Sequence, residues 1–562
     1  MRQKEIKIGQ TSVSDQPSEY TSPSRDGGSS SNVGAAPEIH KSHSSSVSVS
    51  HSSGARLRAT PAPKRKVLEV SETSSQKRFK FGAVRSDLLL SGGKYAVDQV
   101  SAVPNRRHVL EFLIIDGKLT LAYYDRAGPV YSEEFSFVDD LYTYVLLLKR
   151  LTEMNSWEIG FLEDLKEDVK SIAEARARLP TAGIEGTTNI LFTLDLRILD
   201  PAGKNLGKRE LYLVSEIGRR RPYGLITRGT AVFLGYEVAN EKVFAVKISW
   251  PAARRPSEAE ILEKGRNQLS MLDADADTNH RRIYGNRSLA EALPMVELAK
   301  DIDNLRKDKS FRWITENPDS LKEFDETGNR ICRVIVMERL YPIFGLTNLD
   351  QFKQAIRDIV LAHHFLFMSE ERILHRDISL HNLMVRDSDD GAVHGVLIDF
   401  DLASVGLPTS EGHHGRRTGT RRFMAIDLLE KETPLHRERF DWESLFYVIC
   451  WIGTHYSSGE EIKTHIFEEW DTDVDILLVW SKQSVLFGHS RPNLRIRFTD
   501  FYKPLVSSWI ADMQSMFLAA DQARKKFEDA KAANPGRDTP DFDEETIGGI
   551  VTWDKFWQIL KN

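Results

Sequence analysis

The chain has 562 residues, a length that usually holds more than one folded unit. Its 76 basic and 82 acidic residues give a net charge of −6, which argues against nucleic acid as the main partner. Two cysteines, Cys332 and Cys450, are too few for a disulfide framework or a four-cysteine zinc site, and we expect both to be buried. Because no apolar run is long enough for a membrane helix or a secretory signal, we expect an intracellular protein, nuclear or cytoplasmic, that is neither secreted nor membrane-bound.

Residues 1–83 are rich in Ser, Gly, Pro and His and poor in large apolar residues. Such a segment cannot bury enough surface to offset the entropy of ordering, so its composition predicts a disordered arm. Two basic clusters, Lys64–Lys66 and Lys77–Lys80, lie ten residues apart inside it. Their spacing resembles a bipartite nuclear import signal, which an import receptor would bind through Lys64 to Lys80; a merely solvated basic patch is the alternative.

Residues 84–204 have the pattern of an N-terminal α/β subdomain packed on the segment that follows. Three alternating apolar runs, joined by short turns that contain Gly, predict strands paired as hairpins. A longer apolar run then predicts a helix, and two more alternating runs predict strands that lead into the next segment. We expect these elements at residues 108–116, 118–124, 129–137, 141–154, 189–199 and 208–217.

The segment 205–341 has features of a nucleotide-binding small lobe. Two strands flank Gly224 and Gly229, in a loop whose backbone amides are expected to approach phosphates. The next strand, K-V-F-A-V-K-I-S-W, carries Lys247 in the A-V-K context in which protein kinases place a lysine on the α and β phosphates. A solvated surface lysine is the alternative, but the apolar strand around Lys247 favours the functional role.

A helix is expected to begin near Ser257, which is a suitable N-cap. Its first acidic residue, Glu258, is the candidate ion-pair partner that would orient Lys247. The gap of eleven residues between the two is short for a protein kinase, so Glu260 and Glu263 remain alternatives.

Residues 273–332 read as an insertion of helical and polar character, to which the sequence assigns no role. The strand R-V-I-V-M-E-R-L that follows resembles the strand and hinge that bind adenine in protein kinases. In that interpretation Met337 is the gatekeeper, and the backbone from Glu338 to Leu340 forms hydrogen bonds with the base.

The most informative motif lies in residues 342–534, which we interpret as a large lobe. An amphipathic helix leads into His375–Asn382, with the catalytic-loop pattern H-R-D-x-x-x-x-N. Two short strands then lead to Asp399, which begins a D-F-x triplet seventeen residues after Asn382. An ordinary turn is the alternative for this loop, but the strand, turn and strand that follow it are typical of a hairpin with metal ligands.

The residues of this motif match the needs of phosphoryl transfer. One carboxylate must lie near the acceptor hydroxyl, and a set of oxygen ligands must hold Mg²⁺ on the phosphates. Asp377 fits the first role, as base or orienting group, and Asn382 and Asp399 fit the second. Arg376 is useful next to Asp377 when it can pair with a phosphorylated activation loop.

The chain after the D-F-x triplet resembles an activation segment, with basic residues over 413–422. Thr418 and Thr420 are candidates for phosphorylation there; backbone capping is the alternative for Thr418 and the favoured interpretation for Thr420. The end of the segment has Asp427 where a Glu is usual. In the helix that follows, Asp441 is expected to hold the catalytic-loop backbone, unless it merely caps the helix.

The C-terminal tail, residues 535–562, predicts a last helix that packs through Trp553, Phe556 and Trp557. Its aromatic residues recur at helical spacing. The sequence assigns this tail no function beyond packing.

The combination of H-R-D-I-S with Asn382, L-I-D-F-D-L-A, R-T-G-T-R-R-F-M-A and an upstream Y-Y-D-R-A-G-P-V-Y-S-E-E-F-S-F resembles the fungal-type protein kinase family over about residues 90–530. The resemblance implies an α+β, bilobal protein-kinase-like fold with an N-terminal α/β extension. It also implies an ATP site between the lobes, a need for Mg²⁺, and transfer of the γ-phosphate to hydroxyls of an unidentified protein substrate, Ser or Thr by default.

Three departures from the general kinase pattern stand out. Asp401 replaces the Gly of D-F-G, which adds a carboxylate that either binds metal or perturbs Asp399. Ser379 replaces a lysine that Ser/Thr kinases place two residues after the catalytic Asp, and Arg416 or Arg417 is the conjectured substitute for that positive charge. The glycine-rich loop keeps two glycines instead of three.

These departures leave a pseudokinase or interaction scaffold as the alternative function, with the fold retained and turnover lost. A small-molecule phosphotransferase of the aminoglycoside or choline type has Asp and Asn at the same spacing. The presence of Arg376 argues against that class.

Overall fold

The structure is a computed structural model, and it describes residues 86–102, 104–166, 173, 177, 192–199, 205–219, 225, 227–237, 239–275, 287–304, 330–387, 391–406, 418–430, 435–487, 494, 497–533 and 542–562. These residues belong to one compact unit of the chain and contain both helices and antiparallel sheets, as an α+β fold requires. The predicted arm at 1–83, with its basic clusters, lies outside them. None of the helices they form is both long and apolar enough to cross a membrane.

The N-terminal sheet consists of four strands, three of which follow one another as antiparallel neighbours. Both predicted hairpins are confirmed, but the strand predicted at 129–137 is divided into two short strands that pair with the same neighbour. The turn at Asp116 and Gly117 has the two positive φ angles of a tight hairpin turn. Helix α1 packs on β1 through Ala96 and Val100, which the sequence analysis did not predict. The bounds are α1 (Ser86–Ala102), β1 (His108–Ile115), β2 (Lys118–Asp125), β3 (Gly128–Tyr131) and β4 (Phe135–Ser136).

Helix α2 (Leu141–Thr152) follows this sheet and confirms the helix predicted at 141–154. The carboxylate of Asp140 caps it by accepting a hydrogen bond from the Thr143 amide at 3.0 Å. None of the residues of α2 is buried, although its sequence is largely apolar.

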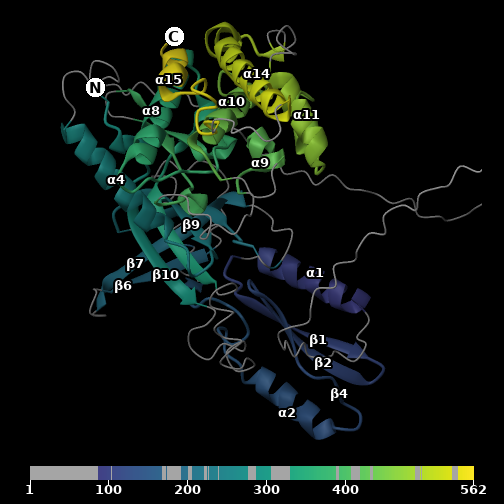
Figure 1. Ribbon diagram of the computed structural model, residues 1–562. Helices are drawn as coiled ribbons and strands as arrows, with labels where there is room; N and C mark the ends of the chain where they lie inside the picture. Colours follow the sequence, from purple (N-terminus) through teal and green to yellow (C-terminus); the bar gives the residue numbers. More distant parts are fainter. Residues whose placement is uncertain are drawn as a thin grey trace, which may run out of the picture. The chain divides into compact units, whose positions relative to one another are not determined.

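A second sheet has seven antiparallel strands in the order β10-β11-β9-β8-β7-β6-β5 (Figure 1). The sheet does not end at the boundary predicted between residues 204 and 205, because β6 and β7 form a hairpin across it. Its strands are β5 (Leu165–Lys166), β6 (Phe192–Leu199), β7 (Asn205–Arg219), β8 (Ala231–Glu237), β9 (Lys242–Ser249), β10 (Val296–Asn304) and β11 (Ile331–Glu338).

Strand β10 corrects the prediction of a helical insertion over residues 273–332. It pairs with β11 along its whole length, and its side chains Leu298 and Ile302 pack against the core of the sheet. The apolar residues alternate with charged ones, which is a strand pattern, but the polar composition of the surrounding segment hid it. Residues 276–286 and 305–329 of the predicted insertion lie outside the described residues.

Helices dominate the rest of the structure and bury the largest core. Helix α10 is the centre of this part, because Trp451 is the only one of its 18 residues that is not buried. Helix α8 packs on β14 so closely that a Cβ at Gly395 would lie 1.9 Å from the Ala355 carbonyl oxygen. The helices are α4 (Glu258–Asp275), α8 (Leu349–Met368), α9 (Ile426–Glu430), α10 (Glu438–His455), α11 (Asp475–Leu486), α13 (Lys503–Leu505), α14 (Ala511–Ala533) and α15 (Trp553–Lys561); the short strands are β12 (Tyr341–Pro342), β13 (Leu383–Asp387), β14 (Val393–Leu397), β15 (Tyr456–Ser457) and β16 (Glu460–Glu461).

The C-terminal helix α15 packs as its sequence predicts. The Phe556 ring stacks on Trp442 of α10 at 4.9 Å, and the Trp553 ring stacks on His364 of α8 at 3.7 Å. Arg357 Nε also donates a hydrogen bond to the Leu560 carbonyl at 2.6 Å. The tail therefore packs against both α8, which precedes the predicted catalytic loop, and α10. Cys332 and Cys450 are both buried, as predicted.

Candidate active site

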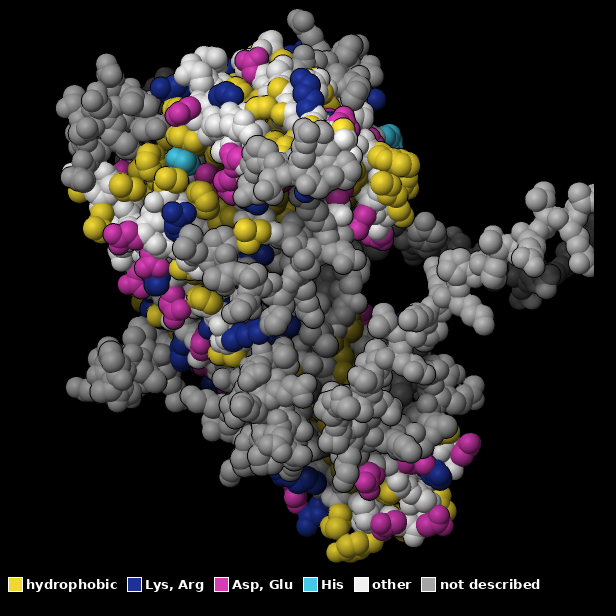
Figure 2. Space-filling model, in the orientation of Figure 1, with side chains coloured by type: hydrophobic (Ala, Val, Ile, Leu, Met, Phe, Trp, Pro, Cys, Tyr) yellow, Lys and Arg dark blue, Asp and Glu magenta, His cyan; other side chains and the backbone are white. Residues whose placement is uncertain are grey.

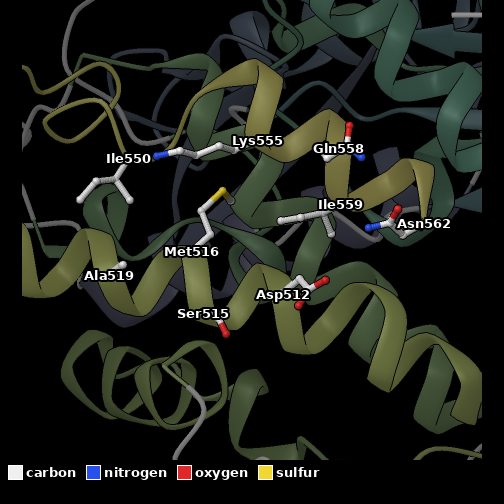
Figure 3. A pocket seen from close by; sticks show the side chains of 9 residues that line it. All are labelled: Asp512, Ser515, Met516, Ala519, Ile550, Lys555, Gln558, Ile559 and Asn562. Atoms are coloured by element: carbon white, nitrogen blue, oxygen red, sulfur yellow. The ribbon is translucent and has the colours of Figure 1, made fainter. Parts of the chain in front are cut away.

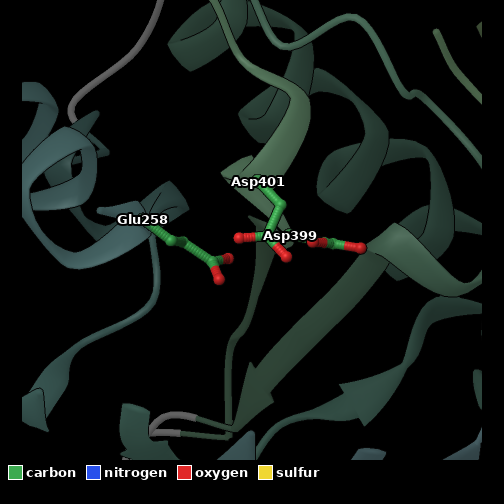
Figure 4. Close-up of side chains that lie close together, drawn as sticks. All are labelled: Glu258, Asp399 and Asp401. Carbon is green, nitrogen blue, oxygen red and sulfur yellow. The ribbon is translucent and has the colours of Figure 1, made fainter. Parts of the chain in front are cut away.

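Lys247 lies at the centre of the candidate site, where three carboxylates surround its ammonium group. Its Nζ is 2.7 Å from Glu258 Oε2, 2.6 Å from Asp399 Oδ1 and 2.9 Å from Asp401 Oδ2. Strand β9 supplies the lysine, the first residue of α4 supplies Glu258, and the turn after β14 supplies the two aspartates. Figure 4 shows the three carboxylates pointing toward one another.

The sequence left three partners open for Lys247, and Glu258 is the one that contacts it. Glu260 is used elsewhere, because its carboxylate accepts from the Ser257 amide at 3.1 Å while Ser257 Oγ accepts from the Glu260 amide at 3.0 Å. This reciprocal capping box confirms the predicted start of α4 and fixes Glu258 in the first turn. Glu263 is exposed on the outer face of the helix.

The electrostatics of this cluster favour added positive charge. Burial alone would lower the pKa of Lys247, but Asp399, Asp401 and Glu258 outweigh it and raise that pKa well above its usual value. Burial raises the pKa of Glu258, although Lys247 opposes the rise. Burial would also raise the pKa of Asp399, but Lys247 and Arg228 hold it below its usual value. One ammonium group therefore serves three crowded carboxylates.

The backbone at Asp399 is strained, with φ of 65° in a residue that is not glycine. Two contacts hold the turn in place. The Phe400 amide donates to Glu258 Oε1 at 2.9 Å, and the Phe400 ring packs edge-on against His375 at 4.7 Å. His375 Nε2 is in turn 2.9 Å from the carbonyl oxygen of Ile398. The catalytic loop and the D-F-x turn are thus locked together.

Asp377 is buried beside this cluster, and its two carboxylate oxygens differ. Oδ1 accepts from the amide of Thr420 at 2.7 Å and from its hydroxyl at 2.8 Å. Oδ2 is buried without a hydrogen-bond partner in the described part of the chain. A buried carboxylate oxygen left unpaired is costly, and a substrate hydroxyl would satisfy it.

Arg376 also has a strained backbone, with φ of 70°, and its amide donates to Asp441 Oδ2 at 3.0 Å. This contact confirms that Asp441 of α10 holds the catalytic loop. The carboxylate of Asp441 contacts His363 and His436 as well, at 2.9 and 3.0 Å. The Arg376 side chain donates to Thr418 Oγ1 at 2.9 Å, so it already faces one of the two threonines predicted as modification sites.

The two predicted magnesium ligands lie at the same end of the β13–β14 hairpin. Asn382 immediately precedes β13, and its carbonyl accepts from the Ile398 amide at 3.0 Å, one residue before Asp399. Asn382 Nδ2 donates to the Asp377 carbonyl at 2.8 Å, and this bond does not use its side-chain oxygen, the atom that would bind a cation. Glu258, Asp399 and Asp401 also have oxygens within 4.8 Å of one another. This set of oxygen ligands suits Mg²⁺.

The predicted adenine-binding residues lie at the end of β11 and directly after it. The Glu338 amide donates to the Met295 carbonyl at 3.1 Å, so only the Glu338 carbonyl is left to bind a base. The Glu338 side chain accepts a hydrogen bond from Arg386 Nε at 2.8 Å, so its carboxylate is already paired. Met337 is buried, and Leu340 lies between β11 and β12.

Of the two predicted loop glycines, Gly224 lies outside the described residues. Gly229 has φ of +50°, and a Cβ there would lie 2.5 Å from the Arg126 guanidinium carbon. Arg126 belongs to the turn between β2 and β3, so the N-terminal sheet contacts the loop that precedes β8. Glycine is needed at this position by both the backbone angle and the close approach.

Asp427 replaces the usual Glu at the end of the activation segment and still forms ion pairs with arginines. The carboxylate of Asp427 lies 2.7 Å from Arg439 and 2.8 Å from Arg524. Burial would raise the pKa of Asp427, but the two arginines lower it to about 2. The departure at this position is therefore compensated.

The sequence analysis missed two arginines of the site. Arg228 Nη1 lies 3.2 Å from Asp401 Oδ2, and Arg255 Nη1 donates to the Asp401 carbonyl at 3.0 Å. No local signal marked them, because both act through a residue more than 140 positions away. The conjectured substitutes, Arg416 and Arg417, lie outside the described residues.

A hollow of about 460 Å³ lies elsewhere, between α14 and α15 (Figure 3). Met516 and Ile559 face each other across it, with Asp512 and Lys555 at its edges. None of its lining residues is among those predicted for phosphate transfer, so we do not place the site there.

A lysine held by two carboxylates, beside a loop that presents an Asp and an Asn, is the arrangement that protein kinases use for phosphoryl transfer. A model of the fungal protein kinase family matches residues 65–453, which is well over half of the chain. The chain therefore belongs to the fungal protein kinase family. Comparison with curated proteins gives no match.

Proposed function

We propose that this chain is an ATP- and Mg²⁺-dependent protein kinase with a bilobal protein-kinase-like fold. The seven-stranded sheet with α4 would form the small lobe, and the helices from α8 onward the large lobe. The observation that carries the proposal is the contact of Lys247 with both Glu258 and Asp399, at 2.7 and 2.6 Å. This contact joins the lysine of β9 to the predicted metal ligand across 152 positions of sequence.

Each residue has a defined task in the proposed reaction. Lys247, oriented by Glu258, would bind the α and β phosphates of ATP. Asp377 Oδ2, buried and unpaired among the described residues, would accept the proton of the substrate hydroxyl. Asn382 and Asp399 would hold Mg²⁺, which would neutralise negative charge on the phosphates.

The nucleotide would lie between the loop before β8 and the strand β11. The Glu338 carbonyl and the Leu340 backbone would bind the adenine, beside the buried Met337. Gly224 and Gly229 would let the loop backbone approach the phosphates. Arg376 would form an ion pair with a phosphate group attached to the activation segment, because its guanidinium already contacts Thr418.

Serine or threonine of a protein is the proposed acceptor, and the protein substrate is unidentified. We also retain the proposal of an intracellular site of action, nuclear or cytoplasmic, with an import receptor that binds Lys64 to Lys80. Nucleic acid and membrane are not proposed as partners, given the net charge of −6. On the face shown in Figure 2, acidic and basic side chains are interspersed.

A pseudokinase or scaffold is the second candidate, and one contact favours it. Asp401 Oδ2 lies 2.9 Å from Lys247 Nζ, so a third carboxylate competes for the lysine that should bind phosphates. Such a protein would keep the fold and lose turnover, whether or not it binds nucleotide.

Thermal shift with ATP, with and without Mg²⁺, tests the proposed function. Ligand that binds only the folded state raises the apparent stability by an amount set by its concentration and its dissociation constant. We expect ATP with Mg²⁺ to stabilise the wild type, and Asp399→Ala to lose the dependence on Mg²⁺. If ATP stabilises neither protein under either condition, the proposed nucleotide site is wrong.

A further inference from the structure

The site lacks one positive charge that protein kinases use near the transferred phosphoryl group. Ser379 stands in place of the lysine, and its hydroxyl is buried without a hydrogen-bond partner in the described part of the chain. Charge spreads over the equatorial oxygens of the phosphoryl group during transfer, so a nearby cation stabilises the transition state. Another residue must supply that charge if the chain is an active kinase.

Three cations lie around the carboxylates in the described part of the chain, and Lys247 is already assigned to the α and β phosphates. Lys247 serves three carboxylates at 2.6–2.9 Å. Arg255 donates to the Asp401 carbonyl, while its own carbonyl accepts from Arg333 at 3.0 Å, which fixes the segment between β9 and α4. Arg255 contacts the backbone carbonyl of Asp401 and not its carboxylate, so it is set against the turn and not against the carboxylates of the site.

Arg228 differs from both. Its side chain is three-quarters buried, with 25% exposed, and its one contact among the described residues is the 3.2 Å pair between Nη1 and Asp401 Oδ2. A guanidinium has five N–H donors in a planar fork that matches a phosphate. Its other donors have no hydrogen-bond partner among the described residues, and a phosphate would match them.

The field around Arg228 comes from the residues assigned to catalysis. Burial would lower its pKa, but the carboxylates of Asp399, Asp401, Asp377 and Glu258 together raise it. The guanidinium therefore stays charged beside Asp401, within the field of the proposed base and of the predicted metal ligand Asp399. A bound phosphate would bring further negative charge to the same place.

The backbone of Arg228 is held from two sides. Its carbonyl accepts from the Trp250 amide at 2.6 Å, which ties it to the end of β9. The next residue, Gly229, lies against the guanidinium of Arg126, and Arg126 Nη2 donates to the Val100 carbonyl at 2.8 Å. Helix α1 and the turn between β2 and β3 thus fix the loop that carries Arg228.

We propose that Arg228 contacts the terminal phosphate of ATP and supplies the positive charge lost at Ser379, and that Asp401 is the positioning residue that holds it there. In the reaction, the acceptor oxygen bonds to the γ-phosphorus as the bond to the β–γ bridging oxygen breaks. The hydroxyl proton passes to Asp377, ADP leaves, and Arg228 stays protonated. The inference rests on the proposed kinase function. The ion pair between Arg228 and Asp401 would explain two departures from the general kinase pattern together, the lost lysine at Ser379 and the added carboxylate at Asp401.

Calorimetric titration of the full chain tests this inference in the presence of Mg²⁺, with ADP and with a non-hydrolysable ATP analogue. We expect Arg228→Met to weaken the analogue about 10- to 100-fold while ADP binding stays unchanged, because only the analogue has the terminal phosphate. Turnover should fall about 10²- to 10³-fold, and Arg228→Lys should recover part of both. Arg254→Met, at an exposed arginine between β9 and α4, is the matched control and should behave as wild type.

Asp401→Asn tests the positioning role. It should reduce the preference for the analogue over ADP, and the double variant with Arg228→Met should be no worse than Arg228→Met alone, since the two residues act as one unit. Wild-type binding of both nucleotides with an unchanged preference in Arg228→Met overturns this inference and leaves the kinase proposal standing. A wild type that binds neither nucleotide overturns both.

Discussion

The N-terminal sheet and the carboxylate cluster around Lys247 are assembled in different ways. Strands β1, β2 and β3 pair with their neighbours along the chain, through turns of two residues. The cluster instead joins β9, α4 and the turn after β14, with contacts that span 11 and 152 positions of sequence. The sheet region also leaves α2 without a buried residue, whereas every charged group of the cluster is paired. Local pairing thus builds the first region, and long-range charge pairing builds the second.

The largest expected effect on stability is at the cluster. Lys247→Met removes the one ammonium group that contacts the buried carboxylate of Glu258 and the partly buried carboxylates of Asp399 and Asp401, so we expect a loss of about 3–5 kcal/mol in the free energy of unfolding. Urea unfolding at pH 7 measures it. The matched control is Lys118→Met in the N-terminal sheet, where the pair with Glu134 at 2.8 Å is largely exposed. Equal effects of the two substitutions would contradict the contrast between the regions.

Acid should loosen the N-terminal sheet. Burial, reinforced by Arg107, lowers the pKa of His108 to about 3, and its ring nitrogen lies 3.0 Å from the Glu158 carbonyl. Stability from the neutral imidazole is complete above pH 6.5, the value in the unfolded chain, and is lost as the pH falls toward 3. At pH 5 we expect a loss of about 2 kcal/mol in the opening free energy of β1.

Hydrogen exchange, corrected for the intrinsic rates, measures this loss. The matched region is the segment around Asp427, whose pKa of about 2 delays its acid response until the pH falls below about 4. Amides of β1 should therefore lose protection at a higher pH than those of α9. In His108→Asn the loss in β1 between pH 7 and 5 should disappear; an unchanged loss would exclude His108 as its cause.

The smallest effect is expected in α2. Figure 2 shows hydrophobic side chains at the lower end of the view, where Figure 1 places this helix. Because Val145 is 53% exposed, Val145→Asp should change the free energy of unfolding by less than about 0.5 kcal/mol. Val448→Asp in the buried helix α10 is the comparison, with an expected loss of more than about 3 kcal/mol. A large loss at Val145 would show that α2 is packed in solution.

The hairpins of the N-terminal sheet could be predicted because alternation and turn residues act locally. Helix α1 could not, since Gly92 and Gly93 disfavour a helix and the reason for Gly92 is tertiary. A Cβ there would lie 2.7 Å from the Tyr124 hydroxyl oxygen. Strand β10 was not predicted either. It is defined by its pairing with β11, which the sequence of its polar segment does not reveal.

In the candidate site, too, some residues could be predicted from local sequence and others could not. Asp377, Asn382 and Asp399 could be found because their spacing is a motif, and Lys247 because of the strand around it. The partner of Lys247 was narrowed to three glutamates, and the capping of α4 was needed to separate them. No local sequence motif identifies Arg228. Only its contact with Asp401, 173 positions away, places it at the site.

Phosphate transfer from ATP by the full chain tests the central claim most directly. The wild type should incorporate the γ-phosphate into its own hydroxyls or into a protein mixture when Mg²⁺ is present, as measured by mass spectrometry. Asp377→Ala should bind nucleotide like the wild type but transfer about 10³-fold less. Transfer by Asp377→Ala at the wild-type rate would refute the role of Asp377, and nucleotide binding without transfer in the wild type would establish the scaffold alternative.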